Sequence, residues 1–265
     1  MKIVLIGAGN VATHLGQALT KANHQILQVY SRTEESATTL AKYLNSDWTT
    51  HIEEVLTTAD LYIVMLKDSV QNEILPQLVK RNPQALFVHT AGSVPMNIWE
   101  GLTHRYGVFY PMQTFSKTRA VDFDQVHFFI EANTSTDAAL LKQLAGQISK
   151  YVYEVTSDQR KYLHLSAVFA CNFTNHMYAI CNELLQAHDL PFSSMFPLID
   201  ETARKIHLLN PKEAQTGPAQ RNDLNVMQKQ ENLLLQDTEL NDPVVAEIYK
   251  MLSQHIVHYQ QSNNK

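Results

Sequence analysis

The chain has 265 residues, of which 45% are hydrophobic and 18% are charged. That length suits one large domain or two modest ones, and the composition is that of a globular protein. The net charge of −5, without a cluster of basic residues, argues against a nucleic-acid partner. No run approaches the roughly 18 apolar residues of a membrane helix, and the opening residues MKIVLIGAG do not place a basic region before a long apolar stretch. We therefore expect a cytoplasmic protein with no membrane partner.

The first part of the chain alternates short β-rich runs with amphipathic stretches. A strand over 2–6, a helix over 10–22 and a strand over 25–30 open this pattern. Further strands are predicted over residues 61–66, 86–90, 105–110, 126–131 and 151–155. The alternation predicts an α/β domain over residues 1–155, with a Rossmann-type, doubly wound and mostly parallel sheet.

The β signal stops after Thr156, where a long pattern of apolar residues at helical spacing begins. It predicts a helix over 158–188 that crosses between domains, followed by an all-helical domain that completes 156–265. Helices are expected there over 193–208, 224–235 and 243–259. Two cysteines, Cys171 and Cys181, fall in the long helix; we expect them to be buried and unpaired, and we expect no metal site.

A glycine-rich turn, GAGNVA at residues 7–12, follows the first strand and opens a helix. Gly7 permits the tight turn, Gly9 lets the backbone approach a pyrophosphate, and Ala12 lets helix and strand pack closely. The free N–H groups of the helix amino terminus favour phosphate there. This pattern predicts a dinucleotide site, although glycines that serve only a tight turn are an alternative. The candidate residues are Gly7, Gly9, Asn10, Val11 and Ala12.

The end of the second strand reads VYSRTEES. Ser31, Arg32 and Thr33 stand where an acidic residue would hold the ribose 2′-hydroxyl of NAD, and a hydroxyl and a guanidinium suit the 2′-phosphate of NADP. We therefore expect NADP in preference to NAD. The segment also fits a capping box with Ser31 as N-cap and Glu34 at the third helical position. Glu34 or its neighbour Glu35 could instead contact the ribose and restore NAD binding.

Two later loops leave the carboxyl ends of predicted strands, where an open α/β sheet binds its ligands. The first contains Lys67, which fits a cofactor contact or an exposed surface lysine. The second contains His89, Thr90 and Gly92, which we expect beside the ribose and nicotinamide. For His89, a hydrogen-bonded histidine at a strand end is the alternative.

The motifs GAGNVATHL, VYSRTEES, VMLKD and HTAGSV, in this order, resemble the Rossmann half of the superfamily that contains pyrroline-5-carboxylate reductase and 6-phosphogluconate dehydrogenase. The later motifs YHLSAVFACNFTN and TGPAQRND resemble a bacterial family of NADP oxidoreductases whose helical carboxyl-terminal domain has no assigned function. The resemblance implies a nicotinamide cleft between the domains and a homodimer formed through the helical domains. The β-hydroxyacid dehydrogenases use a lysine followed four residues later by an asparagine. Here Lys161 is followed by Leu165, so lysine-assisted alcohol oxidation is not implied.

Three polar residues of the second half are candidates for catalysis. His164 and Asn172 lie about 80° apart around the long helix and roughly 12 Å along it, with His176 one turn further. A histidine there could donate a proton and an asparagine could orient a substrate, or both could hydrogen-bond across a helix interface. Arg221, in TGPAQRND, suits a substrate carboxylate or phosphate, unless it forms a structural ion pair while Asp223 caps a helix.

Together these residues predict an NADP-dependent oxidoreductase that acts on a small, anionic carbonyl, imine or hydroxy compound. The alternative is a protein that binds or senses NADP without catalysis. The absence of the lysine and asparagine pair supports this alternative.

Overall fold

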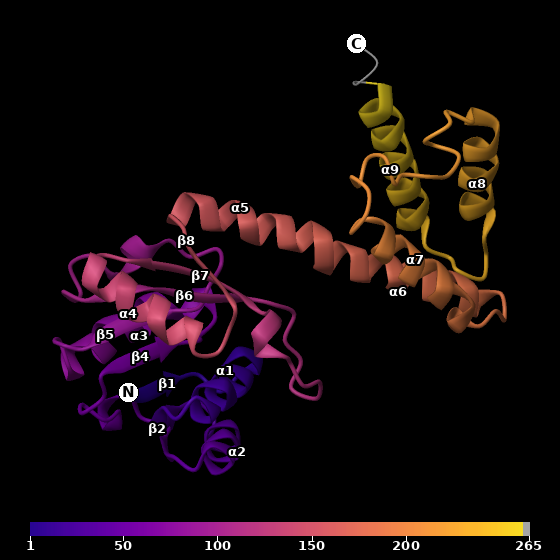
Figure 1. Ribbon diagram of the computed structural model, residues 1–265. Helices are drawn as coiled ribbons and strands as arrows, with labels where there is room; N and C mark the ends of the chain where they lie inside the picture. The colour runs from indigo at the N-terminus through magenta and orange to yellow at the C-terminus, as the bar shows by residue number, and fades with distance from the viewer. Residues whose placement is uncertain (262–265) are drawn as a thin grey trace. The chain divides into compact units, whose positions relative to one another are not determined.

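The computed structural model describes residues 1–261, apart from the side chain of Asp68, and these residues form two compact units that divide between Cys171 and Asn172. In the described part of the first unit, eight strands form one sheet in the order β3-β2-β1-β4-β5-β6-β7-β8 (Figure 1). Every neighbouring pair is parallel except β6 and β7. The strands are β1 (Lys2–Ile6), β2 (Gln25–Tyr30), β3 (Asp47–Thr49), β4 (Leu61–Val64), β5 (Leu86–His89), β6 (Tyr106–Met112), β7 (His127–Ala132) and β8 (Tyr151–Glu154). The predicted class, a mostly parallel Rossmann-like sheet followed by helices, is confirmed.

Helices cover both faces of this sheet (Figure 1). On one face α1 (Asn10–Lys21), α2 (Glu34–Leu44) and α4 (Ser135–Gly146) pack against alternate strand residues such as Leu5. On the other face α3 (Asp68–Arg81) packs against the alternating strand residues that point the opposite way, such as Val4 and Ile6. Burial on both faces explains why these strands read as continuous apolar runs.

The strand order changes direction between β1 and β4, which lie side by side although β2 and β3 intervene in the sequence. In an open α/β sheet, ligands bind at such a switch point, beside the carboxyl ends of the strands. The strand β6 is parallel to β5, so the loop over 113–125 also starts from this edge. That loop contains a short 3-10 helix, Phe123–Gln125, and leads to the antiparallel strand β7.

The predicted long helix is present as a continuous helical run. It consists of α5 (Ser157–Ala167), a π-helical segment η4 (Val168–Phe173) and α6 (Thr174–Ala187). The two compact units divide inside this run, between Cys171 and Asn172, whereas the sequence placed a boundary at residue 155 because the strands end there. The expected burial of Cys171 is wrong: residues 169–173 are all exposed, and Cys181 is only partly buried.

The second unit is helical. After a 3-10 turn, Phe192–Met195, come α7 (Phe196–Lys205), α8 (Leu224–Gln236) and α9 (Pro243–Gln261). Helices α8 and α9 pack together, and the hydroxyl of Tyr249 donates to the side-chain oxygen of Gln230 at 2.7 Å. Among the described residues of this unit, the fully buried ones are Ala219, Val245, Ala246 and Ser253. No helix within residues 1–261 combines the length and the apolar character needed to cross a membrane.

Candidate functional site

The glycine-rich turn joins β1 to α1 in a conformation that requires glycine at position 7. Gly7 has a φ of +124°, and a Cβ there would lie 2.6 Å from the carbonyl oxygen of Met65. Gly9 is the N-cap of α1, without a side-chain cap, and a Cβ there would meet no atom within 4 Å. Ala12 is fully buried against the sheet, and Val11 is partly buried. The turn therefore leaves backbone and helix amino terminus accessible, which fits a pyrophosphate.

A pocket of about 360 Å³ extends from this turn. Three β–α turns line it, Gly7–Gly9, Ser31–Thr33 and Met65–Lys67, together with Lys117 from the loop after β6. Among the side chains that the structure describes, three cationic ones line it, those of Arg32, Lys67 and Lys117, and no acidic one does. None of the three cations forms an ion pair with another side chain that the structure describes. In a chain of net charge −5, unpaired cations around one pocket favour an anionic ligand.

The start of α2 differs from the capping-box prediction, which is wrong. The helix begins at Glu34 with Thr33 as N-cap, and no side chain caps it. The backbone N–H of Ser31 instead donates to the carbonyl oxygen of Thr49 at 3.2 Å, which continues the pairing of β2 with the edge strand β3. The uncapped N–H groups of α2 therefore adjoin the pocket beside Ser31 and Arg32. Neither Glu34 nor Glu35 lines the pocket.

His89 is the last residue of β5 and is fully buried. Its Nδ1 accepts a hydrogen bond from the backbone N–H of Ala91 at 3.2 Å, and its ring stacks on Trp99. Burial, assisted by the charge of Arg160, lowers the pKa of His89 from 6.5 to about 3. The neutral ring holds the turn that follows the strand, as the strand-end alternative expects. Thr90 is also nearly buried, and its N–H donates to the carbonyl oxygen of Val64 at 3.1 Å.

Gly92 brings this loop against α5. A Cβ on Gly92 would lie 2.7 Å from Nδ1 of His164, so only glycine allows the approach. The hydroxyl of Tyr110, in β6, lies 3.2 Å from the same Nδ1. Burial raises the pKa of Tyr110 above its ordinary value. The structure thus joins two predicted residues to a tyrosine that the sequence interpretation missed; its place near the end of a predicted strand was the available signal.

A buried network fixes the first turn of α5 on the sheet. The guanidinium of Arg160, 1% exposed, donates to the carboxylate of Glu131 and to the carbonyl oxygen of Val94. The hydroxyl of Ser157 donates to Glu131 at 2.7 Å. His164 follows Arg160 by one helical turn, so the network sets its position. Lys161 lies outside this network, in an exposed ion pair with Asp158.

The remaining catalytic candidates belong to the second unit and are exposed. Asn172 lies in the π-helical segment, His176 in α6, and Arg221 in a turn before α8. The carboxylate of Asp223 accepts a hydrogen bond from the N–H of Val226 at 3.2 Å, so Asp223 caps α8 as the alternative expected. Within residues 1–261 Arg221 makes no ion pair, which leaves its guanidinium accessible.

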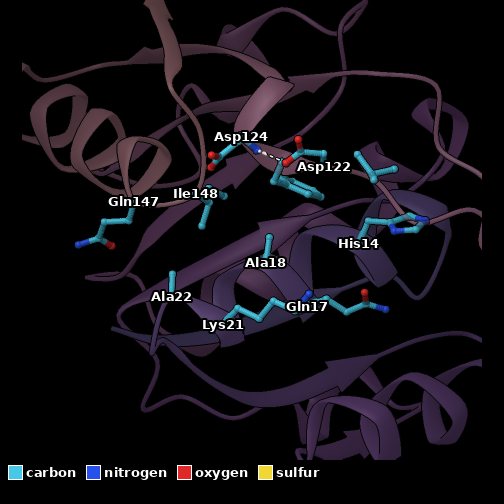
Figure 2. Close-up of a pocket in the computed structure, with 11 residues that line it drawn as sticks. His14, Gln17, Ala18, Lys21, Ala22, Asp122, Asp124, Gln147 and Ile148 are labelled. Carbon is cyan, nitrogen blue, oxygen red and sulfur yellow. Dashed lines mark hydrogen bonds between the residues drawn. The ribbon is translucent and has the colours of Figure 1, made fainter.

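A second pocket, of about 450 Å³, lies along α1 between His14 and Ala22 (Figure 2). Asp122 and Asp124 line it, and both are already engaged. The carboxylate of Asp122 accepts from the N–H of Asp124, and Asp124 pairs with Lys150 at 2.7 Å. Engaged carboxylates in the wall make this pocket a poor phosphate site, so the pocket at the glycine-rich turn is the better candidate.

Comparison with known proteins agrees with this geometry. Residues 2–91 match the family described as NADP oxidoreductase coenzyme F420-dependent, and residues 126–256 match DUF2520, a domain of unknown function. A crystal structure of a candidate NADP oxidoreductase from Bacteroides fragilis is 55% identical, with a TM-score of 0.92, and the match covers 97% of this chain and 98% of that one. No curated protein matches the chain. The resemblance inferred from the motifs is confirmed.

Two more distant structures share the fold. An imine reductase from Myxococcus stipitatus in complex with NADP⁺ is 13% identical, with a TM-score of 0.69, over 98% of this chain and 95% of that one. A pyrroline carboxylate reductase from Plasmodium falciparum with NADP bound is also 13% identical, with a TM-score of 0.59, over 97% of this chain and 98% of that one. At this identity the likeness establishes the fold alone.

Proposed function

This chain belongs to the NADP oxidoreductase family in which a dinucleotide-binding part precedes a domain of unknown function, and from that premise we propose that it uses NADPH to reduce a small, anionic carbonyl or imine compound. The observation that carries the proposal is the pocket beside the glycine-rich turn: among the described side chains, three cations without an ion-pair partner line it and no acid does. The residues fit the cofactor, since Gly7 and Gly9 leave the backbone open to its pyrophosphate.

The preference for NADPH over NADH rests on Ser31 and Arg32. A charge-assisted contact to the 2′-phosphate contributes roughly 1.5 to 3 kcal/mol, so NADPH should bind at least about tenfold more tightly than NADH. Fluorescence titration with both cofactors tests this directly. Equal affinities, or a preference for NADH, would mean that Glu34 or Glu35 contacts the ribose instead.

When bound, the reduced nicotinamide supplies a hydride to the carbon of the substrate's C=O or C=N bond. The residues of this chain that would supply the accompanying proton are His164 and Tyr110, which hydrogen-bond each other beside the Gly92 loop. Asn172 is proposed to orient the substrate, and Arg221 to bind its anionic group through its accessible guanidinium. A screen of keto acids, imino acids and sugar phosphates for oxidation of NADPH tests the reaction class.

The second candidate is an NADP-binding or sensing protein without catalysis. It is favoured by one observation: Lys161 is held in an exposed ion pair with Asp158, at the position where a β-hydroxyacid dehydrogenase would use its lysine. Tight binding of NADPH combined with no turnover across the screen would support this candidate and contradict the first one.

We also propose a homodimer formed through the second unit. This unit exposes large apolar side chains, among them Phe196, Leu198, Leu208, Leu233 and Met251. A second copy of the chain would remove these side chains from water. Light scattering at micromolar concentration tests the proposal, and a monomer there would contradict it.

A further inference from the structure

We propose that the loop over residues 113–117 is part of the cofactor site, that Lys117 binds the pyrophosphate of the dinucleotide, and that Asn10 is the residue that positions it. This inference rests on the proposed function, because it requires that the pocket at the glycine-rich turn holds a nicotinamide dinucleotide. The inference adds a wall to that pocket from a loop that follows β6, whereas the switch point lies between β1 and β4.

Two side chains of α1 anchor the loop. The side-chain amide of Asn10 donates to the carbonyl oxygen of Phe115 at 2.8 Å, and Nε2 of His14 donates to the carbonyl oxygen of Ser116 at 2.8 Å. The ring of His14, which is 5% exposed, also stacks on Phe115 with centroids 5.7 Å apart. Lys117 follows these two held residues directly, and its side chain lines the pocket.

The position of the anchors indicates which phosphate Lys117 meets. Asn10 and His14 lie in the first two turns of α1, immediately after Gly9, where a pyrophosphate binds against the helix amino terminus. Arg32 lies instead at the end of β2, on the side of the adenosine ribose. The cofactor carries its anionic groups at these two places, so Lys117 is assigned to the pyrophosphate and Arg32 to the 2′-phosphate.

The assignment changes the role of Asn10. Its amide N–H group is engaged with the carbonyl oxygen of Phe115, so Asn10 acts on the cofactor through the loop that carries Lys117. The sequence had placed Asn10 among direct cofactor contacts because it belongs to the glycine-rich motif. Its hydrogen-bond partner is 105 residues away in the chain, which only the fold brings close.

The test compares the binding of NADPH and NADH to the wild type and to Lys117→Gln by fluorescence titration. Since both cofactors contain the pyrophosphate, loss of one charge-assisted contact should weaken both by a similar factor, about tenfold. Arg32→Gln should weaken the binding of NADPH far more than the binding of NADH. Lys21→Gln is the matched control, because it removes the same charge from α1 at a residue that lines the second pocket and not the cofactor pocket; both affinities should be unchanged.

Unchanged affinities in Lys117→Gln would overturn the inference while the proposed function stands, provided that the wild type binds. A loss confined to NADPH would also overturn it, because Lys117 would then meet the 2′-phosphate. A wild type that binds neither cofactor would remove both proposals together.

The positioning role of Asn10 is tested by a double-mutant cycle. Asn10→Ala should weaken the binding of both cofactors. The double variant Asn10→Ala, Lys117→Gln should lose no more affinity than the more damaging single variant, because both changes remove the same contact. Additive effects would overturn the positioning role. Thermal unfolding of the four proteins without cofactor is the control for stability. If Asn10→Ala weakened binding only by destabilising the fold, its melting temperature would fall, and the losses of affinity caused by Asn10→Ala and Lys117→Gln would add.

Discussion

The hydroxyl oxygen of Tyr110 lies 3.2 Å from Nδ1 of His164. Burial raises the pKa of Tyr110 above its ordinary value, so its hydroxyl is protonated at neutral pH and can donate to Nδ1. In a neutral imidazole that accepts at Nδ1, the proton resides on Nε2. A hydrogen bond donated by the tyrosine to Nδ1 would select the tautomer in which Nε2 of His164 is the donor available to a substrate.

Replacing this pair should affect turnover more than cofactor binding. His164→Ala should lower the turnover of a substrate found in the screen by about a hundredfold or more, the usual contribution of a general acid. Tyr110→Phe keeps the ring but loses the hydroxyl that contacts Nδ1 of His164, so we expect a smaller loss, about tenfold. The rate of NADPH oxidation measures turnover. Fluorescence titration should find that both variants bind NADPH with an affinity within a few-fold of the wild type. Full turnover in both variants would show that the proton comes from elsewhere.

Gly92→Ala should displace His164. The added Cβ would lie 2.7 Å from Nδ1 and 2.8 Å from Cγ of that ring, so the side chain must move away from Tyr110. Turnover should fall to about the level of His164→Ala, while NADPH affinity changes little. Gly146→Ala, where a Cβ would meet no atom within 4 Å, is the matched control and should keep wild-type turnover. Equal activity of the two variants would contradict the assigned role of Gly92.

The buried network below α5 should dominate the stability of that helix. Glu131→Gln leaves the guanidinium of Arg160 without its counter-charge in a buried position, which should lower the free energy of unfolding by about 3 kcal/mol. Asp158→Asn breaks the exposed ion pair with Lys161 and should cost less than about 1 kcal/mol. Urea denaturation measures both. If both variants lose the same stability, the network contributes no more than a surface pair.

His89 should make the fold sensitive to acid. Its pKa is about 3 in the folded state and 6.5 in the unfolded chain, so the unfolded state binds more protons between these values. Stability from this group is complete above about pH 6.5 and falls as the pH drops toward 3, by up to about 1.4 kcal/mol per pH unit. His89→Gln should flatten the pH dependence of unfolding in this range. His104→Gln, at an exposed position, is the control, and an identical slope in all three proteins would exclude His89 as the cause.

Arg221 tests the substrate part of the proposal. Arg221→Ala should raise KM for an anionic substrate by about tenfold to a hundredfold through loss of a charge-assisted contact, with NADPH affinity within a few-fold. Arg204→Ala, which removes an exposed arginine from α7, is the control. A substrate whose kinetics survive Arg221→Ala unchanged would show that the TGPAQRND turn is structural.

Local patterns predicted the strands and most helices correctly, because they depend on residues close together in the chain. The strand β3 escaped prediction since three residues give no alternating pattern. The start of α2 was misplaced because Ser31 pairs with Thr49, a partner that no local pattern reveals. The burial of Cys171 was misjudged because helical periodicity identifies an apolar face without saying what covers it.

Short motifs were enough to predict the Rossmann-like class, the glycine-rich turn and the family, since the spacing within each motif sets its local geometry. The contact of Tyr110 with His164, the approach of Gly92 to α5 and the hydrogen bond from Asn10 to the loop before Lys117 became visible in the folded chain alone. These contacts join residues tens of positions apart, and sheet topology, which brings the carboxyl ends of separate parallel strands to one edge, is the physical reason that they meet.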